Sequence, residues 1–218
     1  MPNLSMYTPA QFRESRIEIL DEFIRQHRFG LLVSNGSEAP HATHVPMYLV
    51  REGANAVLRC HLARANPHWQ ALETSPAVLA IFSGVHHYVS PSWYPSKQAH
   101  RRVVPTWNYV TVHAAGKARL FEGAELIEHV TELTRRHESG FDQPWSVEDA
   151  PRDFISGLAK AIVGVEISIE RLEGKWKLNQ NRPEADRAGV IDRLEAIASP
   201  ASLEMAEIMK AAAHAQSK

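Results

Sequence analysis

The segment Arg59-Cys60-His61-Leu62-Ala63-Arg64-Ala65-Asn66-Pro67-His68-Trp69 marks the passage from a strand to a helix. The residues before it read as a strand, Asn66 is a good N-cap, and Pro67 suits the first helical position. Free N–H groups in a first helical turn attract anions, and Arg64 adds a guanidinium two residues before the cap. This pattern indicates a bound phosphate. An ordinary strand-to-helix turn with a surface arginine carries the same signature and remains an alternative.

Size and composition indicate a single globular domain over residues 1–218. Hydrophobic residues make up 44% of the chain and charged residues 22%, which is typical of a soluble protein. No apolar run is long enough to span a bilayer, and the N-terminus lacks the features of a signal peptide. Cys60 is the only cysteine, so no internal disulfide can form, and we expect it to be a small buried side chain. These features favour the cytoplasm.

Charge and motif content argue against two common classes of site. The formal net charge is −1, so nothing in the overall charge drives the chain towards nucleic acid. The chain holds 12 histidines, but none fall in an H-E-x-x-H pattern. The neighbours His86 and His87 point to opposite sides if they lie on a strand. We therefore expect no dedicated metal site.

The first half of the chain predicts a helix followed by short strands. Apolar residues at helical spacing predict a helix from Pro9 to His27. Asn35-Gly36 is a strong hairpin signal, and Pro46 implies an edge strand or a bulge. The expected strands are Phe29–Ser34, Ala42–Val50, Ala56–His61 and Val78–Phe82, with a helix over Pro67–Thr74.

The second half begins with an irregular segment from Gly84 to Pro105, and such segments are usually functional or mobile. Ser146-x-x-Asp149 is expected to cap a helical stretch that ends near Ala159. Glu173-Gly174 is expected to turn one strand into the next. The remaining elements are strands over Trp107–Ala115, Lys117–Phe121, Ala161–Leu172 and Lys175–Leu178, and helices over Ala124–Glu138, Pro183–Ala198 and Leu203–Ala213.

These elements predict a mainly β protein with flanking helices, of the α+β class. Six or seven short strands joined by hairpins suggest a small closed or partly closed barrel, with a core from about residue 28 to 180. Helices pack outside it, and two of them, at residues 183–213, follow it.

Several polar and aromatic residues are candidates for binding a planar, phosphorylated ligand. Thr43 and His44 follow the first hairpin, and His61 ends the next strand, so their polar ends could meet at one mouth of the barrel. Trp93 and Trp107 flank the irregular segment, where aromatic rings suit stacking on a planar ligand as well as ordinary packing. The basic run of Lys97, His100, Arg101 and Arg102 reads first as a solvated loop.

The segment from Lys177 to Arg182, Lys-Leu-Asn-Gln-Asn-Arg, brings amide side chains to the end of the strand region. Such amides donate and accept at once, so they can read the heteroatoms of a flavin ring. A turn before a helix that starts at Pro183 is the plainer interpretation.

Together these motifs resemble the PaiB-like family of FMN-binding proteins, often labelled negative transcriptional regulators and related to the pyridoxamine-phosphate-oxidase-like split barrels. The resemblance covers nearly the whole chain. Leu178-Asn179-Gln180 stands where the family is expected to have Leu-Ser-Gln, a mild polar change. The motifs that carry it are Ala42–Pro46, His61–Pro67, Tyr88–Tyr94, Val104–Tyr109 and Lys177–Arg182.

The resemblance implies a split β-barrel homodimer with FMN at the subunit interface. By position, it implies phosphate contacts from Arg59, His61, Arg64 and Asn66. Thr43 and His44 would lie near the ribityl chain or the ring. Further contacts on the flavin are expected from Trp93, Trp107, Asn108, Lys177 and Gln180.

Three functions follow as hypotheses. The first is an FMN-binding protein, a possible flavin-dependent oxidoreductase whose donor would be a nicotinamide or a small molecule. The sequence identifies no catalytic acid or base. The second is a transcriptional repressor that binds FMN without turnover, although the C-terminal helices lack the basic face that DNA binding needs. The third is a heme-binding split barrel.

Overall fold

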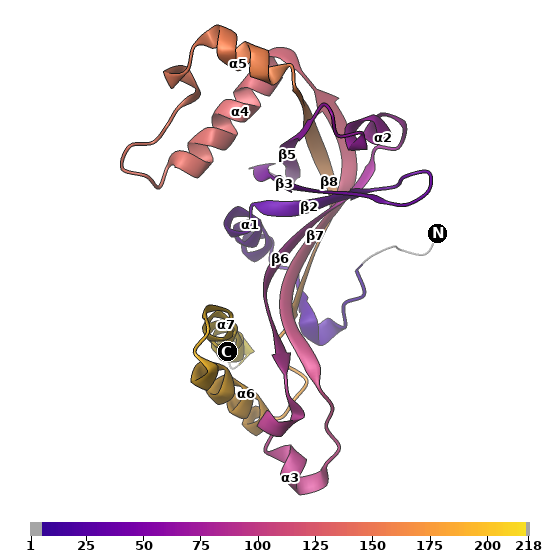
Figure 1. Ribbon diagram of the computed structural model, residues 1–218. Coiled ribbons are helices and arrows are strands. Elements are labelled where there is room, and N and C mark those ends of the chain that lie inside the picture. Colours follow the sequence, from indigo (N-terminus) through magenta and orange to yellow (C-terminus); the bar gives the residue numbers. More distant parts are fainter. Residues whose placement is uncertain (1–5, 217–218) are drawn as a thin grey trace. The chain divides into compact units, whose positions relative to one another are not determined.

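The computed structural model describes residues 6–216, with the backbone alone for residues 214–216. Among these residues the strands form a sheet of eight, in the order β3-β2-β6-β7-β8-β5-β4, with β1 paired to β8 (Figure 1). The mainly β class with flanking helices is thereby confirmed. The strands are β1 (Arg13–Glu14), β2 (Phe29–Ser34), β3 (His41–Pro46), β4 (Tyr48–Glu52), β5 (Asn55–Ala63), β6 (Ala77–Val89), β7 (Thr106–Phe121) and β8 (Ile162–Lys177).

The described helices fall between the strands and after them. Short 3-10 turns occur at η1 (Ala10–Phe12), η2 (Pro91–Trp93) and η3 (Val147–Asp149). No helix in the described part of the chain is long and apolar enough to cross a membrane. The α-helices are α1 (Ile17–Gln26), α2 (His68–Thr74), α3 (Ser96–His100), α4 (Gly123–Glu138), α5 (Arg152–Ala159), α6 (Glu184–Ile197) and α7 (Pro200–Gln216).

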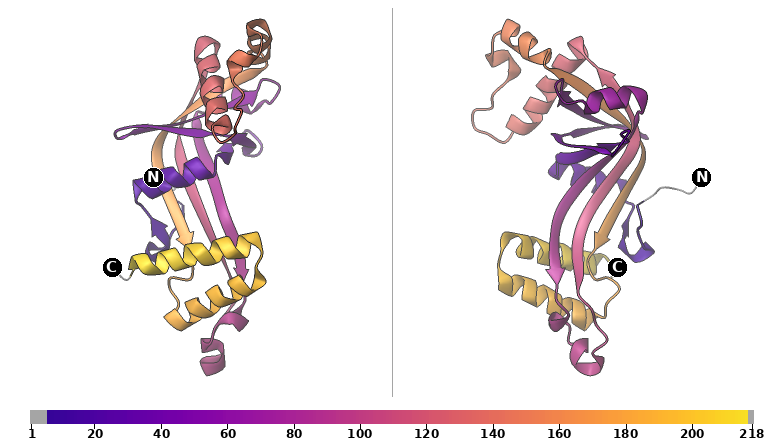
Figure 2. Two further views of the ribbon diagram at one scale, coloured as in Figure 1. Left: turned by 90° about the vertical axis from the view of Figure 1, so that its left-hand side faces the viewer. Right: turned by 45° about the vertical axis from the view of Figure 1, so that its right-hand side comes forward.

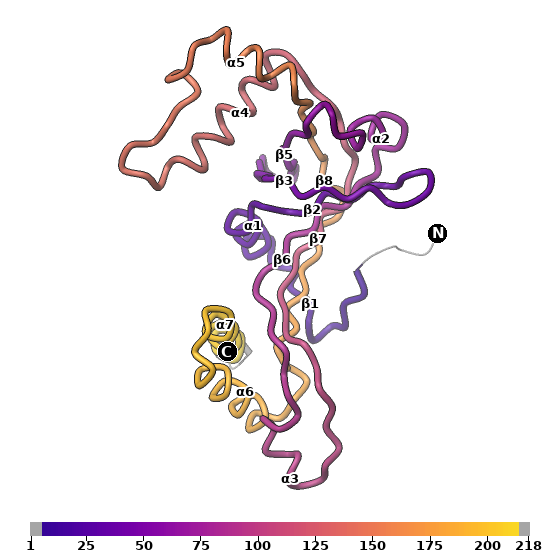
Figure 3. Tube along the Cα trace, in the orientation of Figure 1, coloured from indigo at the N-terminus to yellow at the C-terminus, as the bar shows by residue number. Residues whose placement is uncertain are grey.

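The chain divides into two compact units. Unit 1 holds the residues up to Leu20, Ser83–Val112 and the residues from Glu173 onward; unit 2 holds Asp21–Phe82 and His113–Leu172. Strands β6, β7 and β8 contribute residues to both units. Figure 3 traces these strands as continuous stretches of the chain. Because the same strands pass through both, this division leaves the predicted single domain untested.

Unit 2 is built on two antiparallel ladders with a helix over one of them. Strand β2 pairs with β3 and β6, and β5 pairs with β4 and β8. The residues of β5 alternate, so Leu58, Cys60 and Leu62 are fully buried while Arg59 and His61 face the side covered by α4. Apolar burial of this kind supplies most of the stabilisation of a sheet.

Unit 1 packs a helical pair against strand residues. Helices α6 and α7 lie side by side (Figure 2). Met209 of α7 reaches Asn108 of β7, and Val190 and Leu194 of α6 are fully buried. The chain changes direction between the two helices at Ala198, which has a φ of 53°. The predicted C-terminal helices are confirmed, although α7 begins at Pro200 rather than Leu203, because proline fits the first turn of a helix.

The predicted helix over Pro9–His27 is wrong in its first half. Residues Arg13–Glu14 instead pair with Lys175 and Gly174 of β8, and α1 begins only at Ile17. Strand pairing between residues distant in sequence has overridden the local helical pattern.

The predicted single strand over Ala42–Val50 is two strands. Pro46 ends β3 at one edge of the sheet, and Tyr48 begins β4 at the other. Met47 lies between them, is fully buried, and donates its N–H to the carbonyl of Arg28 at 2.7 Å. The edge placement inferred from Pro46 is confirmed.

Two glycines predicted to separate strands, Gly116 between two strands and Gly174 in a turn, lie inside long strands. A Cβ on Gly116 would come within 2.0 Å of the Ser168 carbonyl oxygen, and one on Gly174 within 2.4 Å of Leu20 Cδ2. These glycines allow close packing rather than a change of direction. The predicted breaks at Gly116 and at Glu173-Gly174 are therefore wrong, and the irregular segment shrinks because β6 continues to Val89.

Candidate functional site

The turn between β5 and α2 carries a closed hydrogen-bond network in unit 2. His68 is 1% exposed; its Nε2 lies 2.9 Å from Ser34 Oγ and its Nδ1 lies 2.8 Å from Thr43 Oγ1. Asn66 donates Nδ2–H to Thr43 Oγ1 at 3.2 Å, and its Oδ1 accepts the backbone N–H of His68 at 3.0 Å. We call Ser34, Thr43, Asn66 and His68 the turn cluster. It joins β2, β3 and the start of α2.

The predicted N-cap is wrong by one residue: α2 begins at His68 and its N-cap is Pro67, which has no side-chain capping bond, although Asn66 Oδ1 accepts the backbone N–H of His68. The helix has seven residues, and the first of its N–H groups is already satisfied by Asn66. The half-buried side chains of Thr43 and Asn66 are thus better hydrogen-bond donors to an anion than the backbone N–H groups at the helix start. His44 points to the other side of β3, is exposed, and stacks on Phe29.

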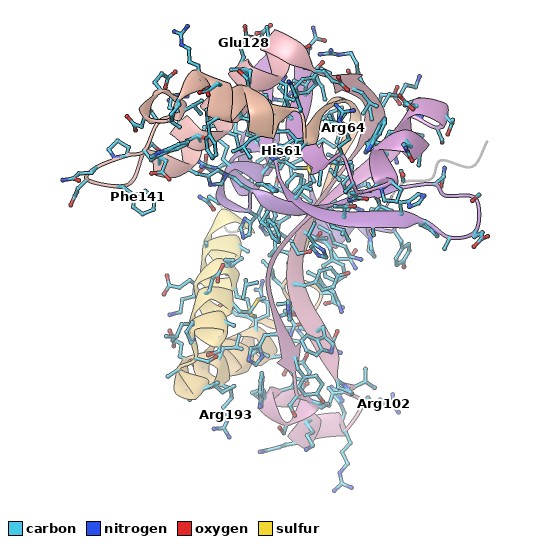
Figure 4. All side chains as sticks on the ribbon, turned by 45° about the horizontal axis from the view of Figure 1, so that its top comes forward. His61, Arg64, Arg102, Glu128, Phe141 and Arg193 are labelled. Atoms are coloured by element: carbon cyan, nitrogen blue, oxygen red, sulfur yellow. The ribbon has the colours of Figure 1, made fainter. Side chains whose placement is uncertain are left out.

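Arg64 lies on the same turn, but its guanidinium bonds residues outside the turn cluster. Arg64, labelled in Figure 4, bonds Glu122 at 2.8 Å and the carbonyl of Lys160 at 3.0 Å. Its guanidinium also lies over the Trp69 ring. The Arg64 and Glu122 side chains are 38% and 58% exposed, and exposed pairs of this kind contribute only about 0–1 kcal/mol. Arg64 also borders a groove of about 540 Å³ that Lys160 and Glu122 line. Its charge is therefore available to an anion.

Arg59 is bound differently. Its Nε donates to Glu166 at 2.7 Å and its Nη2 donates to Glu125 at 2.8 Å, while Arg119 bonds the same two carboxylates. The adjoining groove of about 530 Å³ is lined by four glutamates, Glu52, Glu128, Glu132 and Glu166, against two arginines. A phosphate at Arg59 would meet this excess of negative charge. The structure thus favours Arg64 over Arg59 as a phosphate ligand.

His61 belongs to a buried histidine pair rather than to the turn cluster. Its Nδ1 lies 3.1 Å from Nε2 of His129, which is fully buried and whose Nδ1 lies 3.4 Å from the Tyr48 hydroxyl. Burial lowers the pKa of His61, and burial together with His61 and Arg59 lowers the pKa of His129 to about 3. Both rings are therefore neutral at neutral pH.

The remaining predicted residues lie in unit 1 and form two groups. Trp107 is 51% exposed and lies against His86 and Tyr88 of β6. Lys177 donates to Thr106 Oγ1 at 2.5 Å and lies 5.9 Å from the Tyr109 ring centroid. Burial lowers the pKa of Lys177, with Lys175 adding to the effect.

Three predicted residues are occupied by contacts within unit 1. The Gln180 side chain closes a turn, accepting from the backbone N–H of Leu178 and donating to the carbonyl of Trp176. Asn108 is fully buried against Met209, and its Oδ1 has no hydrogen-bond partner among the described residues. Trp93 lies beside His87. Trp107 is thus the most exposed of the predicted residues in this unit, and Lys177 is half-buried.

Sequence reasoning missed the residues that organise these groups. Ser34 and His68 hold Thr43 and Asn66, and Glu166 and His129 occupy Arg59 and His61. His68 lies two residues after the predicted cap Asn66, and this position is the one local signal that pointed to it. In the described residues no three His, Cys, Asp or Glu side chains gather as metal ligands would.

Comparison with known proteins gives the class of protein to which this architecture belongs. Residues 6–171 match the family model described as "Putative FMN-binding domain". The chain is also 35% identical over 205 residues to the "Protease synthase and sporulation protein PAI 2" of Bacillus subtilis, covering 94% of this chain and 97% of that protein.

Solved structures show the same fold at low sequence identity. A FAD and heme binding protein from Mycobacterium smegmatis matches with a TM-score of 0.56 at 13% identity, over 81% of this chain and 78% of that one. The flavocytochrome Anf3 from Azotobacter vinelandii matches with a TM-score of 0.55 at 15% identity, over 81% and 75%. The fold is the split barrel that the sequence predicted.

The chain belongs to the FMN-binding domain family, and the relative from B. subtilis places it in the PaiB-like branch that its motifs resemble. This membership supports FMN as the cofactor, as predicted.

Proposed function

We propose that this protein binds FMN, with the phosphate at the turn cluster and Arg64, and works as a flavin-dependent oxidoreductase. The observation that carries the proposal is the turn cluster, which offers hydroxyl and amide groups to an anion within a family defined by FMN binding. No carboxylate takes part in the hydrogen bonds of Thr43, Asn66 or His68 in the described chain. A phosphate therefore meets donors there rather than like charge.

The ring of a flavin needs a flat apolar partner and donors at its edge. Trp107 offers an exposed aromatic surface, and the amine of Lys177 offers a cation in the same unit. Taken by itself, unit 1 thus offers groups that suit a flavin ring, and we propose the homodimer as the assembly in which FMN is held. Bound FMN would supply the electron transfer, and the chain would supply binding and orientation.

The test is reduction of the bound flavin. Purified protein loaded with FMN is mixed anaerobically with NADH or NADPH, and the absorbance of oxidised flavin is followed. Bleaching faster than with free FMN supports an oxidoreductase, and equal rates contradict it. Sedimentation in the same buffer tests the homodimer.

Heme binding is the second candidate, because one protein of the same fold binds FAD and heme and another is a flavocytochrome. Adding hemin to the purified protein tests it. A Soret band that is lost in a His44→Ala variant would favour heme, and free hemin passing through gel filtration would exclude it.

The repressor hypothesis gains little from the helical pair. Lys210, the one basic residue of α7 before its end, forms an ion pair with Glu195 of α6, and α7 packs on β7 through Met209. A mobility-shift assay over genomic fragments at moderate salt tests the hypothesis. A shift at micromolar protein would restore it.

A further inference from the structure

The turn cluster contains one ring whose protonation decides which way a neighbouring hydroxyl points. His68 is buried, and both of its ring nitrogens face hydroxyl groups, Ser34 on one side and Thr43 on the other. A neutral imidazole has one N–H donor and one acceptor, so two arrangements of the same atoms exist. The two arrangements differ in whether the Thr43 hydroxyl still has a proton to donate to a ligand.

In the first arrangement the proton is on Nε2. Ser34 Oγ then accepts it, and Thr43 donates its hydroxyl proton to Nδ1. Thr43 would have no proton left to offer. In the second arrangement the proton is on Nδ1, Ser34 donates to Nε2, and Thr43 accepts from Nδ1. Thr43 also accepts from Asn66 Nδ2, so both of its lone pairs are used.

The burial of Ser34 selects between the two arrangements. Ser34 is 4% exposed, and within the described chain its hydroxyl has His68 as its side-chain hydrogen-bond partner. With the proton on Nε2, the Ser34 hydroxyl hydrogen would be buried without an acceptor, which costs about 1–3 kcal/mol. With the proton on Nδ1, Ser34 is satisfied. The hydrogen bond at one ring nitrogen thus fixes the state of the other.

We infer that His68 is a positioning residue that fixes the Thr43 hydroxyl as an outward donor and so gives the turn cluster its preference for a phosphorylated flavin. This rests on the proposed FMN site. A phosphate oxygen is an acceptor only, so it is the partner that an outward hydroxyl requires. Burial and the neighbouring His41 lower the pKa of His68, which keeps the ring neutral at neutral pH. Riboflavin, which lacks the phosphate, should gain nothing from this arrangement.

Ser34→Ala is the sharpest variant, because Ser34 is buried and acts on a ligand only through His68. The readout is the ratio of the dissociation constants of riboflavin and FMN, measured by quenching of flavin fluorescence. We expect the ratio to fall about tenfold in Thr43→Val, by a smaller factor in Ser34→Ala, and not in Thr43→Ser. Ser202→Ala, which removes a buried hydroxyl in unit 1 rather than in unit 2, is the matched control and should leave the ratio unchanged.

A second measurement needs no flavin and no variant. Nitrogen-15 NMR of histidine-labelled protein reports which ring nitrogen of His68 carries the proton. We expect Nδ1 to be protonated and Nε2 to be bare, and a proton on Nε2 would overturn the inference.

The outcomes separate this inference from the proposed function. A wild type that prefers FMN, together with a Ser34→Ala variant that keeps the full preference, would overturn the role of His68 and leave the FMN site intact. A wild type that binds both flavins equally would also overturn it. A wild type that retains neither flavin would contradict the proposed function itself.

Discussion

Arg59 and Glu166 are register partners across the β5–β8 ladder, and the Arg59 guanidinium lies between Glu166 and Glu125. Arg64, five residues further on, has one exposed carboxylate partner instead of two half-buried ones. Arg59 and Arg64 lie in the same strand–turn segment, but breaking the ion pairs of Arg59 costs more free energy than breaking that of Arg64. A phosphate therefore binds more readily to Arg64.

Arg64→Ala should weaken FMN binding at least tenfold, or about 1.4 kcal/mol, because a charged contact to the phosphate is lost. Riboflavin binding should change little. Titration of flavin fluorescence measures both. Arg135→Ala, which also breaks an exposed arginine–glutamate pair, is the control. Unchanged FMN affinity in Arg64→Ala would remove Arg64 from the site.

Arg59→Met should act on stability rather than on binding. It leaves two half-buried carboxylates with one guanidinium fewer, and we expect the free energy of unfolding to fall by about 1–3 kcal/mol. Urea unfolding measures this. FMN affinity should stay within about twofold of wild type. A large loss of FMN affinity in a stable Arg59→Met protein would identify Arg59 as the phosphate ligand.

Asn66 can be tested by two substitutions that separate its roles. Asn66→Ala removes the acceptor for the His68 N–H and should cost about 1 kcal/mol of stability. Asn66→Asp keeps that acceptor but replaces the amide donor with a negative charge, so it should stay folded while FMN affinity falls. Thermal unfolding and flavin titration are compared for both. If the aspartate variant binds FMN as wild type does, Asn66 does not face the phosphate.

The buried histidine pair predicts a dependence of stability on pH. The pKa of His129 is about 3 in the folded protein, below its usual value of 6.5. The unfolded chain therefore binds the extra proton first as the pH falls, and stability declines from about pH 6.5 downward with a slope of up to about 1.4 kcal/mol per pH unit. The full contribution is present above pH 6.5. In His129→Gln the slope should fall by about 1.4 kcal/mol per pH unit, which is the contribution of one proton. An unchanged slope in urea unfolding would refute the assignment.

Cys60 should be unreactive in the folded protein. It is fully buried, and burial raises the pKa of its thiol to about 12. A thiol reagent such as Ellman's should label it only at the rate of unfolding, and fully in denaturant. Rapid labelling under native conditions would show that β5 opens readily.

Local sequence patterns predicted the short elements well. Strand β2 has the predicted bounds Phe29–Ser34, and α4 starts one residue before the predicted Ala124. The long strands were missed because a strand that continues through glycine has the local signature of a turn. Only the partner strand distinguishes them: Ser168 leaves no room for a side chain at Gly116. The pairing of β1 with β8 was equally invisible in the sequence.

The candidate site was predictable as a place but not as a set of contacts. The turn at Asn66-Pro67 was located from its capping pattern, and Thr43 was expected nearby; the structure brings the two together. Which cations stay free depends on carboxylates far away in sequence, such as Glu166 opposite Arg59. The Ser34 hydroxyl belongs to the site only because it bonds His68, and this contact joins a strand end to a helix start far away in sequence.

The most direct test of the central claim is the visible spectrum of the purified protein after addition of FMN and gel filtration. The account predicts a yellow protein with flavin absorption bands that elutes at the size of a dimer and retains FMN better than riboflavin. A colourless protein fraction with all of the FMN in the small-molecule volume would contradict it.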